Sequence, residues 1–349
     1  MSLQTVLGKI ERKDFGIISP HEHILIDLGN FFQAHPVKGV ADPAKEKVRM
    51  DNLGILKRDP YAFLDNLCLD DHELQTRELL YFKAAGGRMV VDATMPGIGR
   101  DPRALRQIAR KTGLHVVMGT GFYVESSHPA TLRDLSDEEI AAGMVREIEV
   151  GVEDTGIKAG FIGEIGISEW FSDSERCVLR AAALAQKHTN VSMHVHINPW
   201  TTHGLEAADI LLQEGVAPNR INICHIDVEN REDYIFRLLE KGLYIEFDNF
   251  GKEYFIDRDV RNSGYGCFVS DVARVRLIRK LVDAGHVRQL LLSCDVCLKT
   301  LLRSYGGWGY DHVLVNIVPM LQEEGLSDTQ IHQLIVENPA DFMDVSVSS

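Results

Sequence analysis

The chain has 349 residues, of which 45% are hydrophobic and 25% are charged, an ordinary balance for a globular enzyme with a large core. Its formal net charge of −14 argues against a nucleic-acid partner, because phosphate binding draws on clustered Lys and Arg. The N-terminus has no apolar signal-peptide core, and no run reaches the ~20 apolar residues of a membrane span. We therefore expect a cytoplasmic protein without a membrane partner. Met1, Ser2 and Leu3 are expected to carry no structural weight.

Six cysteines are scattered through the sequence, which predicts reduced thiols rather than a disulfide framework. Cys294 and Cys297 form a lone C-x-x-C, a spacing also found in redox and zinc sites. A second pair is missing, and Cys294 lies in an apolar run. We interpret the two residues as a buried strand thiol and a loop thiol.

Eight short runs rich in Val, Ile and Leu are typical of buried parallel strands. They cover residues 15–19, 88–94, 115–121, 159–166, 190–196, 221–227, 243–249 and 289–295. Patterns with helical spacing lie between them, most clearly at 101–113, 174–190 and 271–286. This alternation predicts an α/β fold, a (β/α)8 TIM barrel. A doubly wound sheet is disfavoured, because no G-x-G-x-x-G follows the first strand.

No linker or low-complexity stretch divides the sequence, so residues 1–349 are expected to form one barrel domain. Three segments exceed normal loop length, at 28–71, 250–270 and 296–313. In a TIM barrel the loops that follow the strands form the active-site face. We therefore expect these three segments to build the substrate pocket.

Side chains suited to metal binding follow several of the apolar runs. Because the carboxyl ends of barrel strands meet on one face, these side chains are expected to converge there. Imidazole and carboxylate groups are zinc ligands, and two ions that share one water need about this many. The sequence thus predicts a centre for two divalent ions, assigned as zinc. Its candidate ligands are His21, His23, Glu164, His194, His225 and Asp295.

The position of each candidate along its strand suggests its role. His21 and His23 alternate by two, so they point the same way and can chelate one ion. Glu164 would be costly to bury without cations, and bridging two metals removes that cost. His194 lies deeper in its apolar run than His196 and is the predicted ligand. His196 is assigned to the substrate-facing or supporting residues.

Asp295 follows the last apolar run and is predicted to be both the final metal ligand and the catalytic proton acceptor. Two divalent ions would lower the pKa of a shared water toward ~7, and one of them would also polarise a substrate carbonyl. Tyr123 follows the third run and would touch the hydroxide or the substrate; a packed loop tyrosine is the alternative.

Cationic side chains gather in the two long segments after the seventh and eighth runs. Singly, each is more often a solvated surface charge, but together they would pair with a carboxylate or sulfonate on an anionic substrate. The candidates are Lys252, Arg258, Lys299 and Arg303.

The motifs SPHEHI, FIGEIG, SMHVHIN, CHID and LLSCDV, followed by GGWGYDHVL and ENP, resemble the phosphotriesterase family of the amidohydrolase superfamily. The resemblance runs nearly end to end and is greatest for the phosphotriesterase-related branch. It implies that His21, His23 and Asp295 hold a buried metal. His194 and His225 would then hold a more exposed one, and Glu164 would bridge both metals together with a hydroxide.

Two departures from the family pattern narrow the range of expected substrates. Glu164 stands where family phosphotriesterases and many lactonases use a carboxylated lysine, which disfavours efficient phosphotriester hydrolysis. Leu298 and Leu301 stand where members acting on phosphorylated sugar lactones have Arg and Tyr, which disfavours a phosphosugar.

The sequence therefore predicts a metal-dependent hydrolase that uses a metal-bridging hydroxide on a small carboxylic ester, lactone or N-acyl amide. An organophosphate or phosphodiester hydrolase is the alternative enzyme. A non-catalytic ligand-binding barrel is the alternative of another class, but it predicts missing metal ligands, and none is missing. The expected partner is a small-molecule substrate, and the choice between a monomer and a homodimer is left open.

Overall fold

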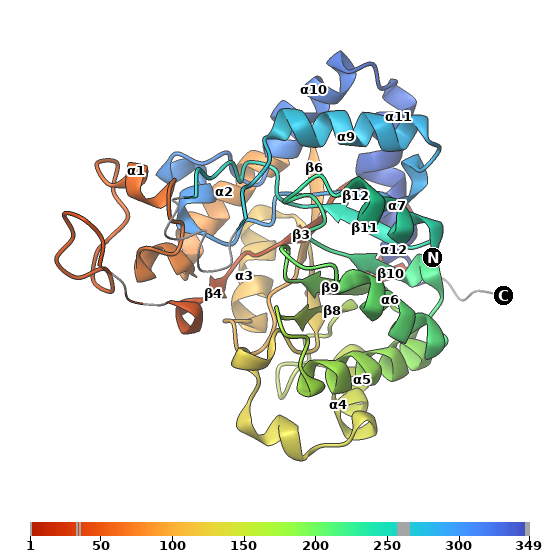
Figure 1. Cartoon of the computed structure of the whole chain (residues 1–349). Coiled ribbons are helices and arrows are strands. Elements are labelled where there is room, and N and C mark those ends of the chain that lie inside the picture. Colours follow the sequence, from red (N-terminus) through yellow and green to blue (C-terminus); the bar gives the residue numbers. More distant parts are fainter. Residues whose placement is uncertain (1, 33, 35, 257–265, 346–349) are drawn as a thin grey trace.

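Eight parallel strands pair in chain order to form a nearly closed barrel in the computed structural model, which describes residues 2–32, 34, 36–256 and 266–345. Each of the eight predicted apolar runs overlaps one of these strands, so the predicted TIM barrel is confirmed. Figure 1 shows the strands at the centre with helices around them. The strands are β3 (Ile17–Glu22), β6 (Gly87–Asp92), β7 (His115–Thr120), β8 (Phe161–Ile167), β9 (Met193–Ile197), β10 (Ile221–Ile223), β11 (Tyr244–Phe247) and β12 (Leu290–Leu292).

A buried carboxylate closes the seam between β3 and β12. Glu22 accepts hydrogen bonds from the backbone N–H groups of Cys294 at 3.0 Å and Val296 at 2.8 Å. The backbone N–H of Asp295 donates to the carbonyl of His21 at 3.3 Å. Burial raises the pKa of Glu22 to about 7, against the hydrogen bonds that favour its charged form. The seam therefore brings His21 and Asp295 side by side.

The predicted helices at 101–113, 174–190 and 271–286 are confirmed as α3, α5 and α9. Capping explains their bounds: Ser172 begins α5 with a capping box, and Asn190 ends it with a left-handed φ of 56°. The helices of the described residues are α1 (Leu53–Leu56), α2 (His72–Ala84), α3 (Pro102–Thr112), α4 (Asp137–Glu149), α5 (Asp173–Thr189), α6 (Gly204–Gln213), α7 (Glu232–Glu240), α9 (Asp271–Asp283), α10 (Val318–Glu323), α11 (Asp328–His332) and α12 (Asn338–Met343). Each of these helices is too short or too polar to cross a membrane.

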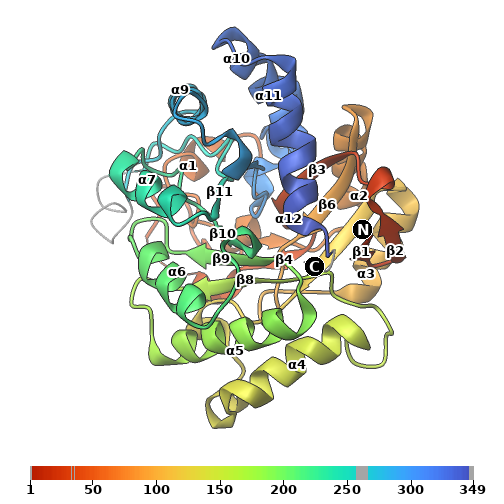
Figure 2. The same cartoon turned by 90° about the vertical axis from the view of Figure 1, so that its right-hand side faces the viewer.

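The segment after β3 projects away from the barrel (Figure 1, red to orange). It carries α1 and lies between β4 (Ile26–Asp27) and β5 (Cys68–Leu69), which pair in antiparallel fashion. This segment has a small hydrophobic core, separate from that of the barrel, which is formed by Val48, Leu56, Ala62 and Phe63. The two ends of the described part of the chain lie on the opposite side of the molecule, which faces the viewer in Figure 2.

A hairpin of β1 (Ser2–Thr5) and β2 (Gly8–Glu11) packs on the barrel. Leu3 is fully buried in one cluster with Phe161 of β8 and Phe342 of α12. Gly160 makes room for this hairpin, because a Cβ there would lie 2.3 Å from the carbonyl oxygen of Gln4. The expectation that Met1 to Leu3 carry no structural weight is therefore wrong for Ser2 and Leu3, while Met1 lies outside the described residues.

The hairpin gives a test of this packing. Leu3→Ala is expected to lower the free energy of unfolding by about 2–5 kcal/mol, because it leaves a cavity in a filled cluster. Leu7→Ala in the same hairpin is the control, since Leu7 is 47% exposed and its loss should change stability by less than about 0.5 kcal/mol. Chemical denaturation measures both, and equal values for the two variants would contradict the packing role of Leu3.

Candidate metal centre

Buried histidines and carboxylates meet toward the carboxyl ends of five barrel strands, β3, β8, β9, β10 and β12. The Nε2 atoms of His21 and His225 each lie 3.3 Å from Oε2 of Glu164. Nε2 of His23 lies 3.1 Å from Oδ1 of Asp295. Two sets of three ligand atoms, His21 with His23 and Asp295 and His21 with Glu164 and His225, each lie within 4.8 Å of one another. The structure thus brings together five of the six predicted metal ligands.

His196, not His194, is the strand-five histidine at this centre. Nδ1 of His196 lies 3.5 Å from Oε2 of Glu164, and its ring centroid lies 4.6 Å from that of His225. The ring of His194 instead packs 5.0 Å from those of Phe161 and Phe342. The geometry therefore brings His196 to Glu164 and His225 and leaves His194 below them, the reverse of the predicted arrangement.

His194 and His196 lie at different depths along β9, which explains why His196 and not His194 reaches the centre. The two histidines share one face of β9, but residues two apart on a strand are about 6–7 Å apart. The carboxylate of Glu164 lies at the level of His196, nearer the carboxyl end of the barrel. His194 lies one layer lower, where Nδ1 accepts a hydrogen bond from Nδ2 of Asn222 at 2.9 Å.

Polar groups lie behind the histidines on the side away from the centre. Nδ1 of His225 lies 2.9 Å from Oδ1 of Asp248, and Nδ1 of His23 lies 2.9 Å from Oγ1 of Thr94. Such contacts fix the ring orientation and leave Nε2 free to bind a metal. Sequence reasoning missed Asp248 and Thr94, although the polar positions in the apolar run LYIEFDN were a usable signal for Asp248.

The charges of the site stabilise one another. Burial opposes ionisation of Glu164, but His21 and His196 hold its pKa well below the usual range. Burial likewise disfavours the charged form of His225, but Asp248 raises its pKa to about 10. The buried carboxylates therefore require positive charge at the centre.

Lys252 supplies a further positive charge beside Asp295. Nζ of Lys252 pairs with Oδ2 of Asp295, and both side chains are buried. Burial would raise the pKa of Asp295, but Lys252 and then His23 lower it well below the usual range. Lys252, predicted as a substrate-binding residue, therefore lies directly against the predicted catalytic carboxylate.

The backbone at the centre is strained in places. His225 and Asp295 adopt left-handed φ values of 59° and 45°, each of which costs on the order of 1–3 kcal/mol in a residue with a side chain. Gly163, directly before Glu164, has a φ of 109°, and a Cβ there would lie 2.2 Å from the carbonyl oxygen of His194. Such strain is typical of residues that are held for function.

The donor atoms at the centre fit divalent cations. Among the described residues, neither Nε2 of His21 nor Oδ1 of Asp295 has a hydrogen-bond partner, although both atoms are buried. Unpaired buried polar atoms are costly, and a cation bound between them would satisfy them. Imidazole nitrogens combined with carboxylates are a donor set for metals such as zinc.

Of the other residues predicted to contact the substrate, one lies next to the centre and two are paired with carboxylates elsewhere. The hydroxyl of Tyr123 lies 3.3 Å from both ring nitrogens of His196, next to the centre. Nζ of Lys299 is 2.8 Å from Asp65, and Arg303 pairs with Asp311, so both cations already have carboxylate partners. Their substrate roles stay predictions, and Arg258 lies outside the described residues.

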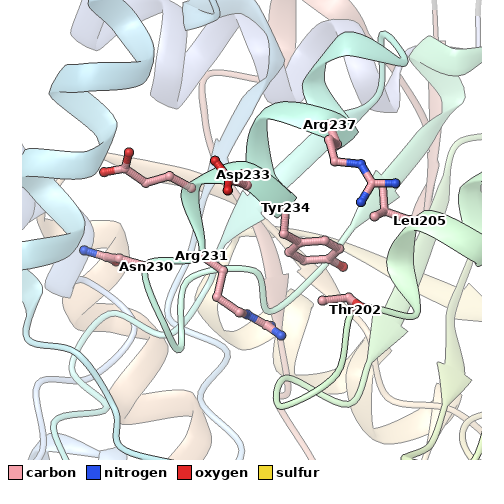
Figure 3. Close-up of a pocket in the computed structure, with 8 residues that line it drawn as sticks. Thr202, Leu205, Asn230, Arg231, Asp233, Tyr234 and Arg237 are labelled. Carbon is pink, nitrogen blue, oxygen red and sulfur yellow. The ribbon is translucent and has the colours of Figure 1, made fainter.

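Two surface depressions lie among the described residues, and neither is lined by the histidines of the candidate metal centre. One of about 600 Å³ is lined by residues from the starts of α6 and α7, including Thr202, Arg231 and Tyr234 (Figure 3). The guanidinium of Arg231 donates to the carbonyls of Thr201 and Pro199, each at 2.6 Å. These bonds hold the loop before α7 against the loop before α6. The other, of about 500 Å³, lies along the projecting segment and includes Asp65 and Lys299.

A parallel barrel with reactive side chains at the carboxyl ends of its strands is the architecture of (β/α)8-barrel enzymes. Comparison with known proteins defines the family more narrowly. The model of the phosphotriesterase family matches residues 1–343, so the chain belongs to the phosphotriesterase family. It is a hydrolase of that family, and the membership inferred from the sequence motifs is confirmed.

Individual relatives cover nearly the whole chain. N-acetyltaurine hydrolase of Rattus norvegicus is 34% identical over 347 residues, 98% of this chain and 97% of that protein. The crystal structure of a resiniferatoxin-binding protein from Rhodobacter sphaeroides matches with a TM-score of 0.94 at 35% identity, covering 99% of this chain and 96% of the other. The phosphotriesterase homology protein from Escherichia coli, solved with phosphate in its active site, matches with a TM-score of 0.78 at 29% identity, covering 95% and 99%.

The exchange of the two histidines can be tested by metal analysis. His196→Ala is expected to lower metal affinity by more than the ~10–100-fold that loss of a supporting residue costs, because it removes a ring that contacts Glu164. His194→Ala should keep the metal and lose stability on the order of 2–4 kcal/mol, because it empties a buried position between two aromatic rings. Loss of metal from His194→Ala alone would contradict the placement of β9.

Proposed function

We propose that the protein hydrolyses a small N-acyl amide, carboxylic ester or lactone, and that an N-acyl amide with an anionic group is the preferred substrate. One observation carries the proposal: Glu164 is buried among histidine nitrogens at 3.3–3.7 Å, with Asp295 beside them. The relationship to N-acetyltaurine hydrolases supports the substrate class, because N-acetyltaurine is an acyl amide that carries a sulfonate.

Two divalent ions, assigned as zinc, would be held on either side of Glu164. Oε1 of Glu164 lies 3.7 Å from Nε2 of His23, whereas Oε2 faces His225 and His196 and also lies 3.3 Å from Nε2 of His21. A carboxylate whose two oxygens face different histidines is suited to bridge two ions. His21, His23 and Asp295 would hold one ion, and His196 and His225 would hold the other.

Bound ions would lower the pKa of a water toward ~7 and polarise the scissile carbonyl. The protein's own groups handle the proton: when Oδ1 of Asp295 holds an ion, Oδ2, the oxygen beside Lys252, would accept it. Asp295 would then return the proton to the leaving amine or alcohol. The hydroxyl of Tyr123, 3.3 Å from a ring nitrogen of His196, would donate to the substrate oxygen.

Lys252 is the group that would select an anionic substrate. Of the three predicted cations that the structure describes, Lys252 is the one at the centre, where its ammonium is buried against Asp295. Cations bound to Asp295 would weaken this pair and leave the ammonium to contact a sulfonate or carboxylate on the substrate. A charge-assisted contact of this kind orients the acyl group over the site.

Two other functions have a specific observation in their favour. The Escherichia coli neighbour was solved with phosphate in its active site, which favours a phosphodiester or organophosphate substrate. The Rhodobacter sphaeroides neighbour is described as a resiniferatoxin-binding protein, which favours ligand binding without turnover. The complete set of buried histidines and carboxylates in this chain favours catalysis over binding alone.

Metal analysis and a substrate panel test the proposal together. We expect about two divalent ions per chain by elemental analysis, and loss of activity when a chelator removes them. The zinc-loaded protein should hydrolyse N-acetyltaurine, N-acyl amino acids, lactones or carboxylic esters at least 10-fold more efficiently, as kcat/KM, than a phosphotriester or a phosphodiester, a difference of about 1.4 kcal/mol. An active preparation with one ion or none would contradict the two-metal centre, and tight ligand binding without any turnover would favour the binding barrel.

Substitution of Lys252 tests the choice of an anionic substrate. Lys252→Met keeps the aliphatic length and removes the charge, so kcat/KM for an anionic acyl amide should fall by about 10–100-fold, mainly through KM. Hydrolysis of a neutral ester of similar size is the control and should change by less than about 3-fold. An equal loss on both substrates, carried by kcat, would instead assign Lys252 to the support of Asp295.

A further inference from the structure

A second polar layer lies beneath the candidate metal centre, nearer the floor of the barrel. It is formed by Glu246 of β11, Asn222 of β10, Ser293, Cys224 and His194, all of which are essentially fully buried. The proposed function uses none of these side chains. A carboxylate at this depth is expensive unless it is fully hydrogen-bonded, so its presence calls for an explanation.

Glu246 is held rigidly by its neighbours. The hydroxyl of Ser293 donates to Oε1 at 3.1 Å, and Nδ2 of Asn222 donates to Oε2 at 2.5 Å. These bonds come from the strands on either side of β11, so they fix the carboxylate in the middle of the barrel. Oε2 then faces upward to His21, whose Nδ1 is 3.4 Å away.

Glu246 is also the carboxylate that is nearer to Nδ1 of His21. The other candidate, Asp248, lies farther away at 3.7 Å. Asp248 already accepts from the backbone N–H of His225 at 2.9 Å, lies 2.9 Å from its Nδ1, and accepts from Nδ2 of Asn249 at 2.8 Å. A carboxylate behind Nδ1 favours the tautomer that carries its proton there and leaves the Nε2 lone pair facing Glu164.

The same layer also contains four atoms that could surround an ion, from His21, His194, Cys224 and Glu246. The amide of Asn222 argues against that use. Its Nδ2 already lies 2.9 Å from Nδ1 of His194, 2.5 Å from Oε2 of Glu246 and 3.5 Å from Sγ of Cys224. An amide donor among these acceptors forms a hydrogen-bonded network without a metal.

We propose that Glu246 is a positioning residue that sets the orientation and tautomer of His21 from below. Asn222 and Ser293 hold Glu246 in place for this purpose. The inference rests on the proposed metal centre, because its consequence is that His21 presents Nε2 to an ion shared with His23 and Asp295. Asp248 does the same for His225 from its own side, so each of the two histidines has its own carboxylate.

Metal affinity measured on Glu246→Gln tests the proposal. The metal-depleted protein is titrated with Zn²⁺ against a chromophoric chelator, and the d–d spectrum of the Co²⁺ form reports the ligand geometry. We expect a 10–100-fold loss of affinity for the ion at His21 and a changed Co²⁺ spectrum, because a glutamine has one acceptor oxygen and no negative charge, so it cannot accept from both Asn222 and Ser293 and still face His21 as an anion.

Glu175→Gln is the matched control. Glu175 is equally buried, and its carboxylate accepts the backbone N–H groups of Ser168 and Ser172 away from the histidines. It should lose thermal stability in the metal-free state, as Glu246→Gln does, but keep its Zn²⁺ affinity and Co²⁺ spectrum. Should Glu246→Gln fail to fold, Ser293→Ala withdraws one donor from Glu246 and should show a smaller loss of affinity in the same direction.

The outcomes separate this inference from the proposed function. Wild-type protein that binds no ion overturns the metal centre itself, whatever the variants do. Wild-type protein with two ions and an unchanged affinity in Glu246→Gln overturns only the role of Glu246. Three ions in the wild type and two in Glu246→Gln would show that the lower layer binds a metal, which also overturns the positioning role.

Discussion

Negative charge buried along the barrel axis is the constraint on which the rest of the site depends. Glu164, Asp295, Asp248 and Glu246 are all nearly inaccessible to solvent. An uncompensated carboxylate in such a place costs several kcal/mol, so each one requires a cation or several donors. The histidines, Lys252 and the donors from neighbouring strands meet that requirement, and divalent ions would meet the part that remains.

The hydrolase site and the closure of the barrel are the same piece of structure. Glu22 lies between His21 and His23 in the sequence, yet its carboxylate points to the backbone on either side of Asp295. Successive side chains of β3 therefore point to opposite faces, so the two histidines reach the centre and the carboxylate between them reaches the seam. This division explains why a short HEH motif supports both the fold and the chemistry.

The barrel, and the meeting of five of the six candidate ligands at one place, followed from the sequence because apolar runs mark strands and the site lies where those runs end. The exchange of His194 and His196 shows the limit of this reasoning. A period of two gives the face of a strand, but depth depends on how neighbouring strands are staggered, which is a property of the assembled barrel. Glu246 was missed for a related reason, since its role depends on partners from two other strands. Lys299 and Arg303 lie in long segments without periodicity, where the partner of a charge cannot be predicted.

The seam between β3 and β12 has a thermodynamic consequence. His23 and Asp295 come from opposite ends of the chain, and their side chains meet at 3.1 Å across the seam. An ion held by both would act as a reversible cross-link that closes a loop spanning most of the polypeptide, and long loops gain the most from being closed. Because such a ligand set exists only in the folded chain, metal concentration and resistance to unfolding would be linked. A chelator would then act on this barrel as a mild denaturant as well as an inhibitor.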